Sequence, residues 1–517
     1  MVGKFGKRAR YEPKVHSDLT KTRNLAGGVA YKPSDKAELV KRVLTWYVAE
    51  PKFYGSTTDE TVRIMELIHG IGTYEPEFLL KLAVFARNAM YLRSAPVFIL
   101  IESLSIPEVR RICRPYVSLI LSRADTLTEA IALYKLRHGK EKNGRRIIGA
   151  LPRQFRKGLE DAFHNFDTYQ FGKYAAKNDE VKMRDVIRVV HPTPLNEKEA
   201  ELFYDIRHQK VEPPVTWETI LSDAKKNLKS KTEAWEFVIP KMGYMAKLRN
   251  LRNMIQAKIS PDSMDSVLQH LTNVNAISGS RQYPYRFYNA YRVIERESLD
   301  PFLKQKVLQA IEQALDTSVL TQKKISGKTA VFVDLSGSMK KPISKSTVAY
   351  RHEVAALYGA IAHGLFDEAI VGAFAESYAT VPVNPTDSVF TNMKRILGTR
   401  VGGNTNGHLA IDYLTYKRIK VDRVLVFTDE QMWNSSSYYH GGRRYFAESW
   451  KQYLTSINPN AKLYVFDLAG YGYSLTPENM QGVTQISGFS DKVFRFMEFA
   501  DKEPADLVEW VESVSVE

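Results

Sequence analysis

Hydrophobic residues recur every three or four positions through residues 35–320, as they do along the buried face of an α-helix. Leu79, Leu82, Ala83 and Ala86 show this spacing. The alternation of hydrophobic and polar residues that marks a strand is hard to find in this part of the chain. Many helices of similar spacing predict stacked helical pairs rather than a single bundle.

Two motifs predict where individual helices begin. Thr126 and Glu129 have the spacing of a capping box, in which each side chain bonds to a backbone N–H at the helix start. Ser260, Pro261 and Asp262 form the other motif, with serine as the N-cap, proline in the first turn and an acidic residue near the positive end of the helix dipole.

The pattern changes after residue 326. Continuous hydrophobic runs separated by helical stretches are typical of a mostly parallel sheet covered by helices on both faces. The predicted strands are Thr329–Asp334, Ala369–Ala375, Val424–Thr428 and Lys462–Asp467. We therefore expect an all-helical domain over residues 1–326 and a doubly wound α/β domain over residues 327–517, with a polar linker at 323–328.

Oxygen-bearing side chains follow two of the predicted strands. Asp334, Ser336 and Ser338 alternate at the end of the first strand, Asp429 follows the third, and Thr405 lies in a glycine-containing loop. Open α/β sheets bind ligands at the carboxyl ends of their strands, and oxygen ligands suit Mg²⁺. The pattern predicts a site for Mg²⁺ or another divalent cation, whereas an aspartate alone at such a junction would be explained as a helix cap.

The composition is that of a globular protein, with 44% hydrophobic and 25% charged residues. The single cysteine, Cys113, excludes an intrachain disulfide and a thiolate zinc cluster. No apolar stretch approaches the roughly 20 residues of a membrane helix, and no apolar run follows the basic N-terminus. We expect a cytoplasmic protein without membrane association.

The net charge of +15 is distributed unevenly along the chain. Residues 327–517 contain 19 basic and 21 acidic side chains, which leaves 54 basic and 37 acidic side chains in residues 1–326. The positive excess therefore lies in the helical part and indicates a polyanionic partner such as nucleic acid. A basic surface that only confers solubility is the alternative.

The motif formed by Asp334, Ser336 and Ser338, with Thr405 and Asp429, resembles the metal-ion-dependent adhesion site of von Willebrand factor A domains. The resemblance implies a Rossmann-like fold. It also implies that the hydroxyl groups bind the metal directly and that the aspartates bind it directly or through water.

Several stretches of the helical part, taken together with this A domain, resemble the Ro autoantigen family, whose N-terminal part is the TROVE domain. These stretches are YLRSAP (91–96), LPR (151–153), FGKY (171–174), RDVIRVVHP (184–192), AKLRNLR (246–252) and YPYRF (283–287). The resemblance implies a ring of HEAT-like helical repeats closed by the A domain.

The same resemblance implies a non-enzymatic RNA-binding protein. Members bind small structured Y RNAs on the outer surface of the ring and single-stranded 3′ ends of misfolded or precursor RNAs in its hole. They act in RNA quality control, maturation or decay with exoribonucleases such as polynucleotide phosphorylase.

Basic residues in the family-like stretches are candidates for RNA contacts. Arg184, Arg188 and His191 recur at steps of four and three residues, so that one helix face can present them to Y RNA. Lys173 is a further RNA-binding candidate. The alternative is a solvated helix face on which His191 ends the helix before Pro192.

A second basic group lies in two segments that also carry tyrosines, which can stack on bases. We expect some of its members to line the hole: Lys241, Lys247, Arg249, Arg252, Arg281 and Arg286. For Arg249 and Arg286 an interhelix contact is the alternative.

Two other functions are compatible with parts of the sequence. The basic half of an A-domain adaptor would bind acidic protein surfaces rather than RNA. A nuclease would use Asp334, Asp429 and Glu430 around Mg²⁺, but these residues lie in the nearly neutral half, and no P-loop, HExxH or GxSxG motif is present.

Overall fold

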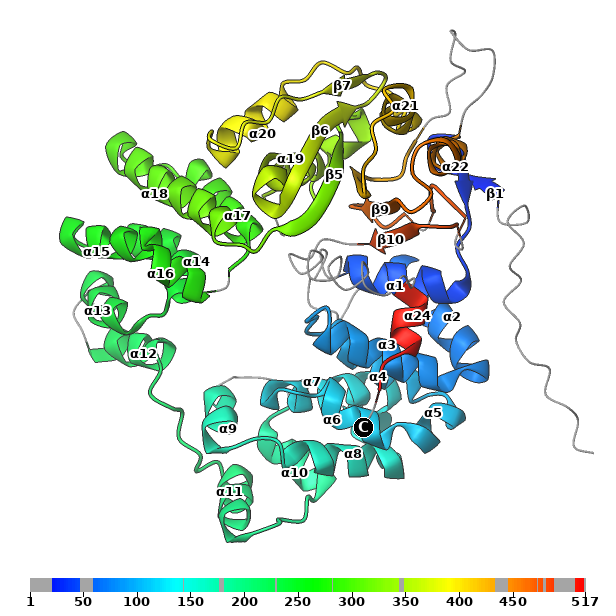
Figure 1. The fold of residues 1–517 in the computed structure, drawn as a ribbon. Helices are drawn as coiled ribbons and strands as arrows, with labels where there is room; N and C mark the ends of the chain where they lie inside the picture. The colour runs from blue at the N-terminus through cyan, green and yellow to red at the C-terminus, as the bar shows by residue number, and fades with distance from the viewer. Residues whose placement is uncertain are drawn as a thin grey trace, which may run out of the picture. The chain divides into compact units, whose positions relative to one another are not determined.

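The computed structural model describes residues 21–46, 59–142, 144–175, 181–227, 230–280, 282–343, 348–432, 445–471, 473–477, 480–487 and 507–515 (Figure 1). The chain divides into two compact units: residues 1–21, 32–214 and 505–517 form one, and residues 22–31 and 215–504 form the other. Within the described ranges, no helix has the length and apolar character needed to cross a membrane.

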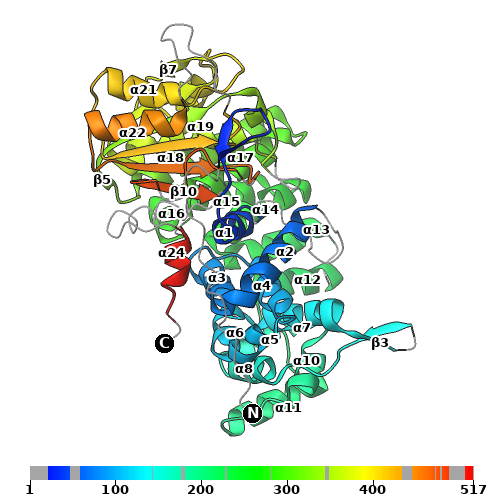
Figure 2. The same cartoon turned by 90° about the vertical axis from the view of Figure 1, so that its right-hand side faces the viewer.

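Short helices that pack on near neighbours in the sequence make up the first unit. They are α1 (Asp35–Trp46), α2 (Asp59–Tyr74), α3 (Pro76–Asn88), α4 (Ala95–Ser103), α5 (Pro107–Ile112), α6 (Arg114–Ile120), α7 (Ala124–His138), α8 (Arg153–Phe163), α9 (Thr168–Ala175), α10 (Met183–Val190), α11 (Glu197–His208) and the C-terminal α24 (Leu507–Glu512). A hairpin of β3 (Lys140–Lys142) and β4 (Arg145–Ile147) extends away from these helices (Figure 2).

The C-terminal helix α24 returns to the first helices of the chain and contacts α1 and α3. Lys36 of α1 forms an ion pair with Glu512 at 2.6 Å. The ammonium group of Lys81 in α3 donates to the backbone carbonyl of Glu512 at 2.8 Å. Residues at the two ends of the described chain therefore stabilise the same helical unit.

The predicted helix starts have different outcomes. Ser260 is the N-cap of α15, and its side chain accepts a hydrogen bond from the backbone N–H of Ser263, as predicted. The capping box at Thr126 is wrong, because α7 begins earlier, with Arg123 as its N-cap residue. The Thr126 hydroxyl instead donates to the carbonyl of Arg123 at 2.6 Å, inside the first turn.

The second unit contains helices that precede the α/β part in the chain, and residues 22–31. Its helices before the sheet are α12 (Trp217–Asn227), α13 (Lys231–Val238), the 3₁₀ turn η2 (Ile239–Lys241), α14 (Tyr244–Gln256), α15 (Pro261–Thr272), α16 (Val274–Ser280), α17 (Pro284–Arg296) and α18 (Pro301–Leu320). The short strands β1 (Lys21–Arg23) and β2 (Val29–Tyr31) pair with each other.

A six-stranded sheet of order β10-β9-β8-β5-β6-β7 forms the centre of the α/β part. All neighbouring strands are parallel except β6 and β7. The strands are β5 (Ile325–Asp334), β6 (Phe366–Phe374), β7 (Tyr378–Thr380), β8 (Arg423–Thr428), β9 (Lys462–Asp467) and β10 (Val483–Ser487). The helices are α19 (Arg351–Leu365), α20 (Val389–Leu397), α21 (His408–Tyr416) and α22 (Phe446–Ser456), with a 3₁₀ turn η3 (Gly337–Lys340).

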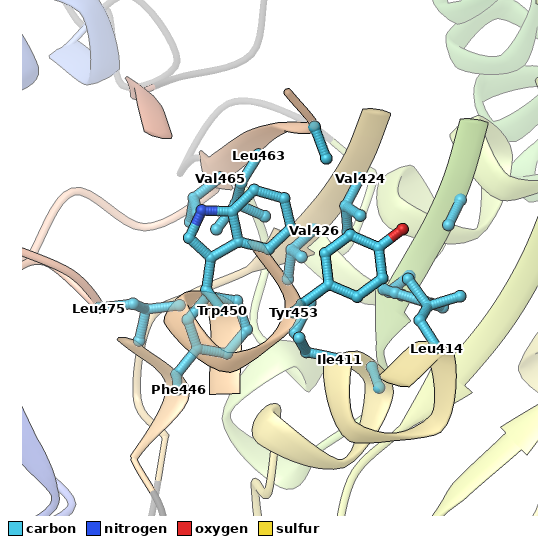
Figure 3. Close-up of a cluster of buried hydrophobic side chains, with 14 of the residues drawn as sticks. Ile411, Leu414, Val424, Val426, Phe446, Trp450, Tyr453, Leu463, Val465 and Leu475 are labelled. Carbon is cyan, nitrogen blue, oxygen red and sulfur yellow. The ribbon is translucent and has the colours of Figure 1, made fainter. Parts of the chain in front are cut away.

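One face of the sheet packs against α21 and α22. Val424 and Val426 of β8 point toward Trp450 and Tyr453 of α22, and Phe332 of β5 belongs to the same buried cluster (Figure 3). The Tyr453 hydroxyl accepts a hydrogen bond from the N–H of Val421, just before β8. This core fixes β8, and with it the loop that follows at Asp429.

The other face packs against α19. Phe427 alternates with Val426 along β8, and its ring stacks on Tyr358 of α19 with centroids 5.0 Å apart. Gly359 permits a close approach, because a Cβ at this position would lie 3.0 Å from a side-chain atom of Val333. Helices on both faces of a mostly parallel sheet confirm the predicted doubly wound architecture.

The strand predictions are correct in position, with differences at the ends. The predicted linker is partly wrong, because Ile325 already pairs with Phe366 as part of β5. The division into compact units falls at residues 214–215 and does not test the domain boundary at 326–327, which stays a prediction. Helix α18 packs against α19 and α20, and the Asp316 carboxylate accepts from the N–H of Val389 at 2.8 Å.

Candidate metal centre and basic surfaces

Asp334 ends β5, and both of its carboxylate oxygens are engaged. The N–H of Ser336 donates to Oδ1 at 2.8 Å, and the Thr428 hydroxyl at the end of β8 donates to Oδ2 at 2.7 Å. Since β5 and β8 are neighbours in the sheet, their carboxyl ends meet at one edge. The fold therefore ties the loop after β5, which carries Ser336 and Ser338, to the loop after β8, which carries Asp429.

Asp429 lies within reach of the serines of the first loop. The Ser338 hydroxyl donates to Asp429 Oδ1 at 3.0 Å, and the Ser336 and Ser338 hydroxyl oxygens lie 3.3 Å apart. Asp429 and Ser336 are fully buried. Four of the five predicted metal ligands are thus linked by hydrogen bonds at the carboxyl edge of the sheet.

Thr405, the fifth predicted ligand, is buried in the loop before α21. The carbonyl of Gly403 in this loop accepts from the N–H of Gly337 at 3.2 Å. This bond brings the loop of Thr405 beside the loop of Ser336 and Ser338. Asn406, the next residue, is held at the end of β6 by the carbonyls of Ala375 and Glu376.

Burial dominates the electrostatics of the two aspartates. It raises the pKa of Asp334 to about 7, and the charge of Asp429 adds to this rise. Burial also raises the pKa of Asp429, although the Ser338 hydroxyl and the Arg351 guanidinium oppose it. Two buried carboxylates this close favour a bound cation, because it would stabilise both charged forms.

The donor set fits a hard divalent cation. Two carboxylates and adjacent hydroxyl groups are oxygen ligands, and Mg²⁺ commonly binds one or two carboxylates and completes its shell with water. The described residues contain no group of three or more His, Cys, Asp or Glu side chains placed to hold a metal. Any metal at this edge would therefore depend on the serine and threonine hydroxyls as well as on Asp334 and Asp429.

The predicted outer RNA contacts lie on α9 and α10 of the first unit. Arg184 and Arg188 are one helical turn apart in α10, and His191 ends the helix as its C-cap, with φ of 51°. Arg188, His191 and Lys173 of α9 are exposed. Arg184 is half-buried and donates to the Gln209 side chain at 2.5 Å.

A basic pocket at the junction of α5 and α8 was missed by the sequence reasoning. It has a volume of about 450 Å³ and is lined by Pro107, Arg110, Arg111, Pro152, Arg153 and Gln154. All three arginines are exposed. The RRICR and LPR sequences carried the signal, but only packing of α5 on α8 joins them.

The pocket connects to the outer residues through α8. Arg156, one turn after Arg153, donates to the carbonyl of Val190 at the end of α10 at 3.1 Å. Glu160 further along α8 accepts from the N–H of Thr193, beyond His191. Helix α8, which carries Arg153 of the pocket, is therefore hydrogen-bonded to the end of α10, where the predicted outer contacts lie.

The second basic group lies in the other unit, and its members differ in how far they are exposed to solvent. Arg249 and Arg286 are exposed. The Nε atom of Arg252 lies 4.0 Å from Oε1 of Glu297. The ammonium group of Lys241 lies 4.3 Å from the ring centroid of Phe237.

Lys247 lies in α14 and is only 6% exposed. Burial lowers the pKa of this lysine. Arg281 lies outside the described residues. Contact of RNA with any member of this group stays a prediction.

Comparison with known families matches this arrangement. The TROVE domain profile matches residues 44–209 and 205–358, which together are more than half of the chain. The chain belongs to the TROVE domain family. In this TROVE protein, the Ro60 vWA domain profile matches residues 328–499, which include the sheet and all five predicted metal ligands.

Relatives of this TROVE protein cover different parts of it. The RNA-binding protein RO60 of Deinococcus radiodurans is 21% identical over 529 residues, which cover 91% of this chain and 93% of that protein. The RNA-binding protein RO60 of Caenorhabditis elegans is 24% identical over 50% of this chain and 40% of that protein. Telomerase protein component 1 of Mus musculus is 25% identical over 45% of this chain, which spans only 12% of that much longer relative.

A solved structure shares the fold. The crystal structure of the Deinococcus radiodurans RO (RSR) protein aligns with a TM-score of 0.65 at 17% identity, covering 91% of this chain and 100% of that one. The match confirms the predicted combination of a helical-repeat domain with a C-terminal A domain.

Proposed function

We propose that this TROVE protein binds structured RNA through the basic surface of α8–α10 and has no catalytic activity. The observation that carries the proposal is the exposure of Arg188 and His191 at the end of α10, beside Arg184. Exposed basic side chains close together suit the phosphates of an RNA helix, which proteins contact mainly through its shape and backbone. Two relatives named RNA-binding protein RO60 support this function.

The RNA would be a small structured RNA of the Y type, or a misfolded or precursor RNA with a single-stranded 3′ end. We assign the single-stranded end to the second basic group, where Arg249, Arg252 and Arg286 are exposed and Tyr283 and Tyr285 are partly exposed. Aromatic rings beside cations suit unpaired bases joined by phosphates.

The A domain would recruit a protein partner, such as an exoribonuclease, through Mg²⁺ held by the five predicted ligands. Bound Mg²⁺ would supply a positive charge with an open position that an acidic side chain of the partner can complete. The Thr428 hydroxyl holds Asp334 in place, and the Ser338 hydroxyl holds Asp429. A cytoplasmic location is part of this proposal.

The decisive experiment measures binding of a structured RNA with a single-stranded 3′ tail as a function of salt concentration. The Arg184→Ala/Arg188→Ala variant should bind more weakly and reduce the salt slope by about two, roughly one for each lost phosphate contact. The Lys417→Ala/Lys420→Ala variant loses the same charge from exposed positions of the A domain and should bind like the parent.

Removal of the tail tests the second part. The tail-less RNA should bind the parent more weakly, and Arg249→Ala/Arg252→Ala should abolish that difference. Weak binding that is insensitive to salt and to RNA shape would contradict RNA binding. It would favour the adaptor function, in which the basic half contacts acidic protein surfaces.

A further inference from the structure

The guanidinium group of Arg351 lies against the predicted metal ligands. Arg351 is the first residue of α19 and is only 9% exposed. Its Nη1 lies 3.4 Å from Asp429 Oδ2 and donates to the Tyr471 hydroxyl at 3.0 Å. The guanidinium carbon also lies 5.2 Å from the centroid of the Tyr471 ring.

The position of this arginine is not explained by the helix that carries it. A positive charge in the first turn of a helix is unfavourable, because the helix dipole is positive there. The Nε atom of Arg351 is buried and has no hydrogen-bond partner among the described residues. The ion pair with Asp429, together with the contacts to Tyr471, accounts for a buried cation at this place.

Asp429 is fully engaged with Arg351 in place. Its Oδ1 accepts hydrogen bonds from the Ser338 hydroxyl at 3.0 Å and from the N–H of Gln431 at 3.3 Å. Its Oδ2 faces the guanidinium group. A divalent cation that binds Asp429 must therefore share this carboxylate with a positive charge or displace it.

We propose that Arg351 is an internal counter-ion that competes with the divalent cation for Asp429 and sets a low affinity of the site for metal. The inference rests on the metal site of the proposed function. Without metal, Arg351 balances the buried carboxylate and the loops stay folded. Metal binding displaces the guanidinium group from Asp429 toward solvent, so that metal occupancy and the position of Arg351 are coupled.

The expected change in metal affinity can be estimated from the effect of a nearby positive charge on the proton affinity of a carboxylate. An opposite charge within about 4–6 Å of a carboxylate typically shifts its proton affinity by roughly ten- to a thousandfold. Removing the Arg351 charge should therefore tighten divalent binding by about tenfold or more.

The test titrates the full-length chain with Mn²⁺ and counts free Mn²⁺ by electron paramagnetic resonance, and also records the change in Tm on adding Mg²⁺. Arg351→Gln should bind Mn²⁺ at least about tenfold more tightly than the parent. Arg351→Lys, which keeps the charge, should bind close to the parent. Arg418→Gln, an exposed position in the same domain, should leave binding unchanged.

A second variant guards against misfolding of Arg351→Gln. Tyr471→Phe removes the hydroxyl that accepts from Arg351 but leaves the arginine, and should tighten Mn²⁺ binding by a few fold, since the guanidinium is held less firmly. Unchanged or weaker binding in both variants would overturn the counter-ion role and assign Arg351 to holding the ligands in place. Asp429→Asn defines the background of the titration.

The two proposals fail differently. If the parent binds Mn²⁺ above the Asp429→Asn background and the Arg351 and Tyr471 variants bind no better, only the counter-ion inference is wrong. If neither the parent nor Arg351→Gln binds above that background, the metal site itself is wrong, and the inference falls with it.

Discussion

The side-chain amide of Asn24 donates to the backbone carbonyl of Met432 at 2.8 Å and to that of Glu430 at 3.2 Å. Its carbonyl oxygen accepts from the N–H of Gly28 at 2.9 Å and of Ala26 at 3.1 Å. A residue near the start of the described chain thus holds the loop that follows β8 and carries Asp429. Residues 22–31 belong to the same compact unit as the A domain.

Replacing Asn24 with alanine should destabilise this unit by about 1–3 kcal/mol, because two buried carbonyls and a turn lose their partner. Urea unfolding measures the change. Asn253→Ala removes an exposed amide bonded to Asn250 and should alter the free energy of unfolding by less than about 0.5 kcal/mol. Equal effects of the two substitutions would show that the Asn24 bonds do not stabilise the loop.

Gly28 packs directly against the same loop. A Cβ at Gly28 would lie 2.0 Å from the carbonyl oxygen of Met432, whereas a Cβ at Gly279, exposed in α16, would meet nothing within 4 Å. Gly28→Ala should destabilise by about 1–3 kcal/mol through this overlap. Gly279→Ala should stabilise by roughly 0.5–1 kcal/mol, because glycine disfavours a helix. Opposite shifts in Tm are the expected result, and shifts of the same sign would contradict it.

Burial of Lys247 predicts a stability that depends on pH. Its folded-state pKa is lowered, so the folded protein resists protonation of this lysine and loses stability as pH falls below the unfolded value of 10.5. Lys247→Met removes this penalty and should raise the free energy of unfolding at pH 7, with a gain that shrinks as pH approaches 10.5. Urea unfolding at pH 7 and pH 10 measures the difference.

The matched control for Lys247 is the exposed Lys241, which lies over Phe237. Lys241→Met removes an exposed ammonium group that carries no burial penalty, so it should not raise the free energy of unfolding at pH 7. If Lys247→Met is less stable than the parent at pH 7, the buried ammonium group must be held by favourable interactions that exceed its burial penalty.

The arginine pocket predicts a longer RNA footprint than α10 alone provides. Arg111→Ala/Arg153→Ala should reduce the salt slope of RNA binding by about two, because each exposed arginine would contact one phosphate. The effect should be large for a long RNA helix and small for one too short to reach from α10 to α5. A slope equal to that of Lys417→Ala/Lys420→Ala for every RNA length would exclude the pocket from the RNA surface.

The pattern of hydrophobic residues along the chain was enough to predict the central strands of the sheet. The predicted strand Lys462–Asp467 has the same bounds as β9, because a continuous hydrophobic run between polar residues allows little else in a covered parallel sheet. The edge strands β7 and β10 were not predicted, since short strands at an edge carry little hydrophobic pattern. Thr126 misled for a similar reason: its spacing to Glu129 fits a cap, but the chain was already helical at Ala124.

The sequence by itself determined the two kinds of architecture and the residues of the metal motif, because periodicity and short-range spacing are local properties. Only the tertiary structure decided which side chains meet. Asp334 and Ser338 join Asp429 because β5 and β8 are neighbours in the sheet. Arg351 meets Asp429, Asn24 meets Met432, and Arg110 meets Arg153 in the pocket, each across a long separation along the chain. Such contacts depend on packing, which no local pattern records.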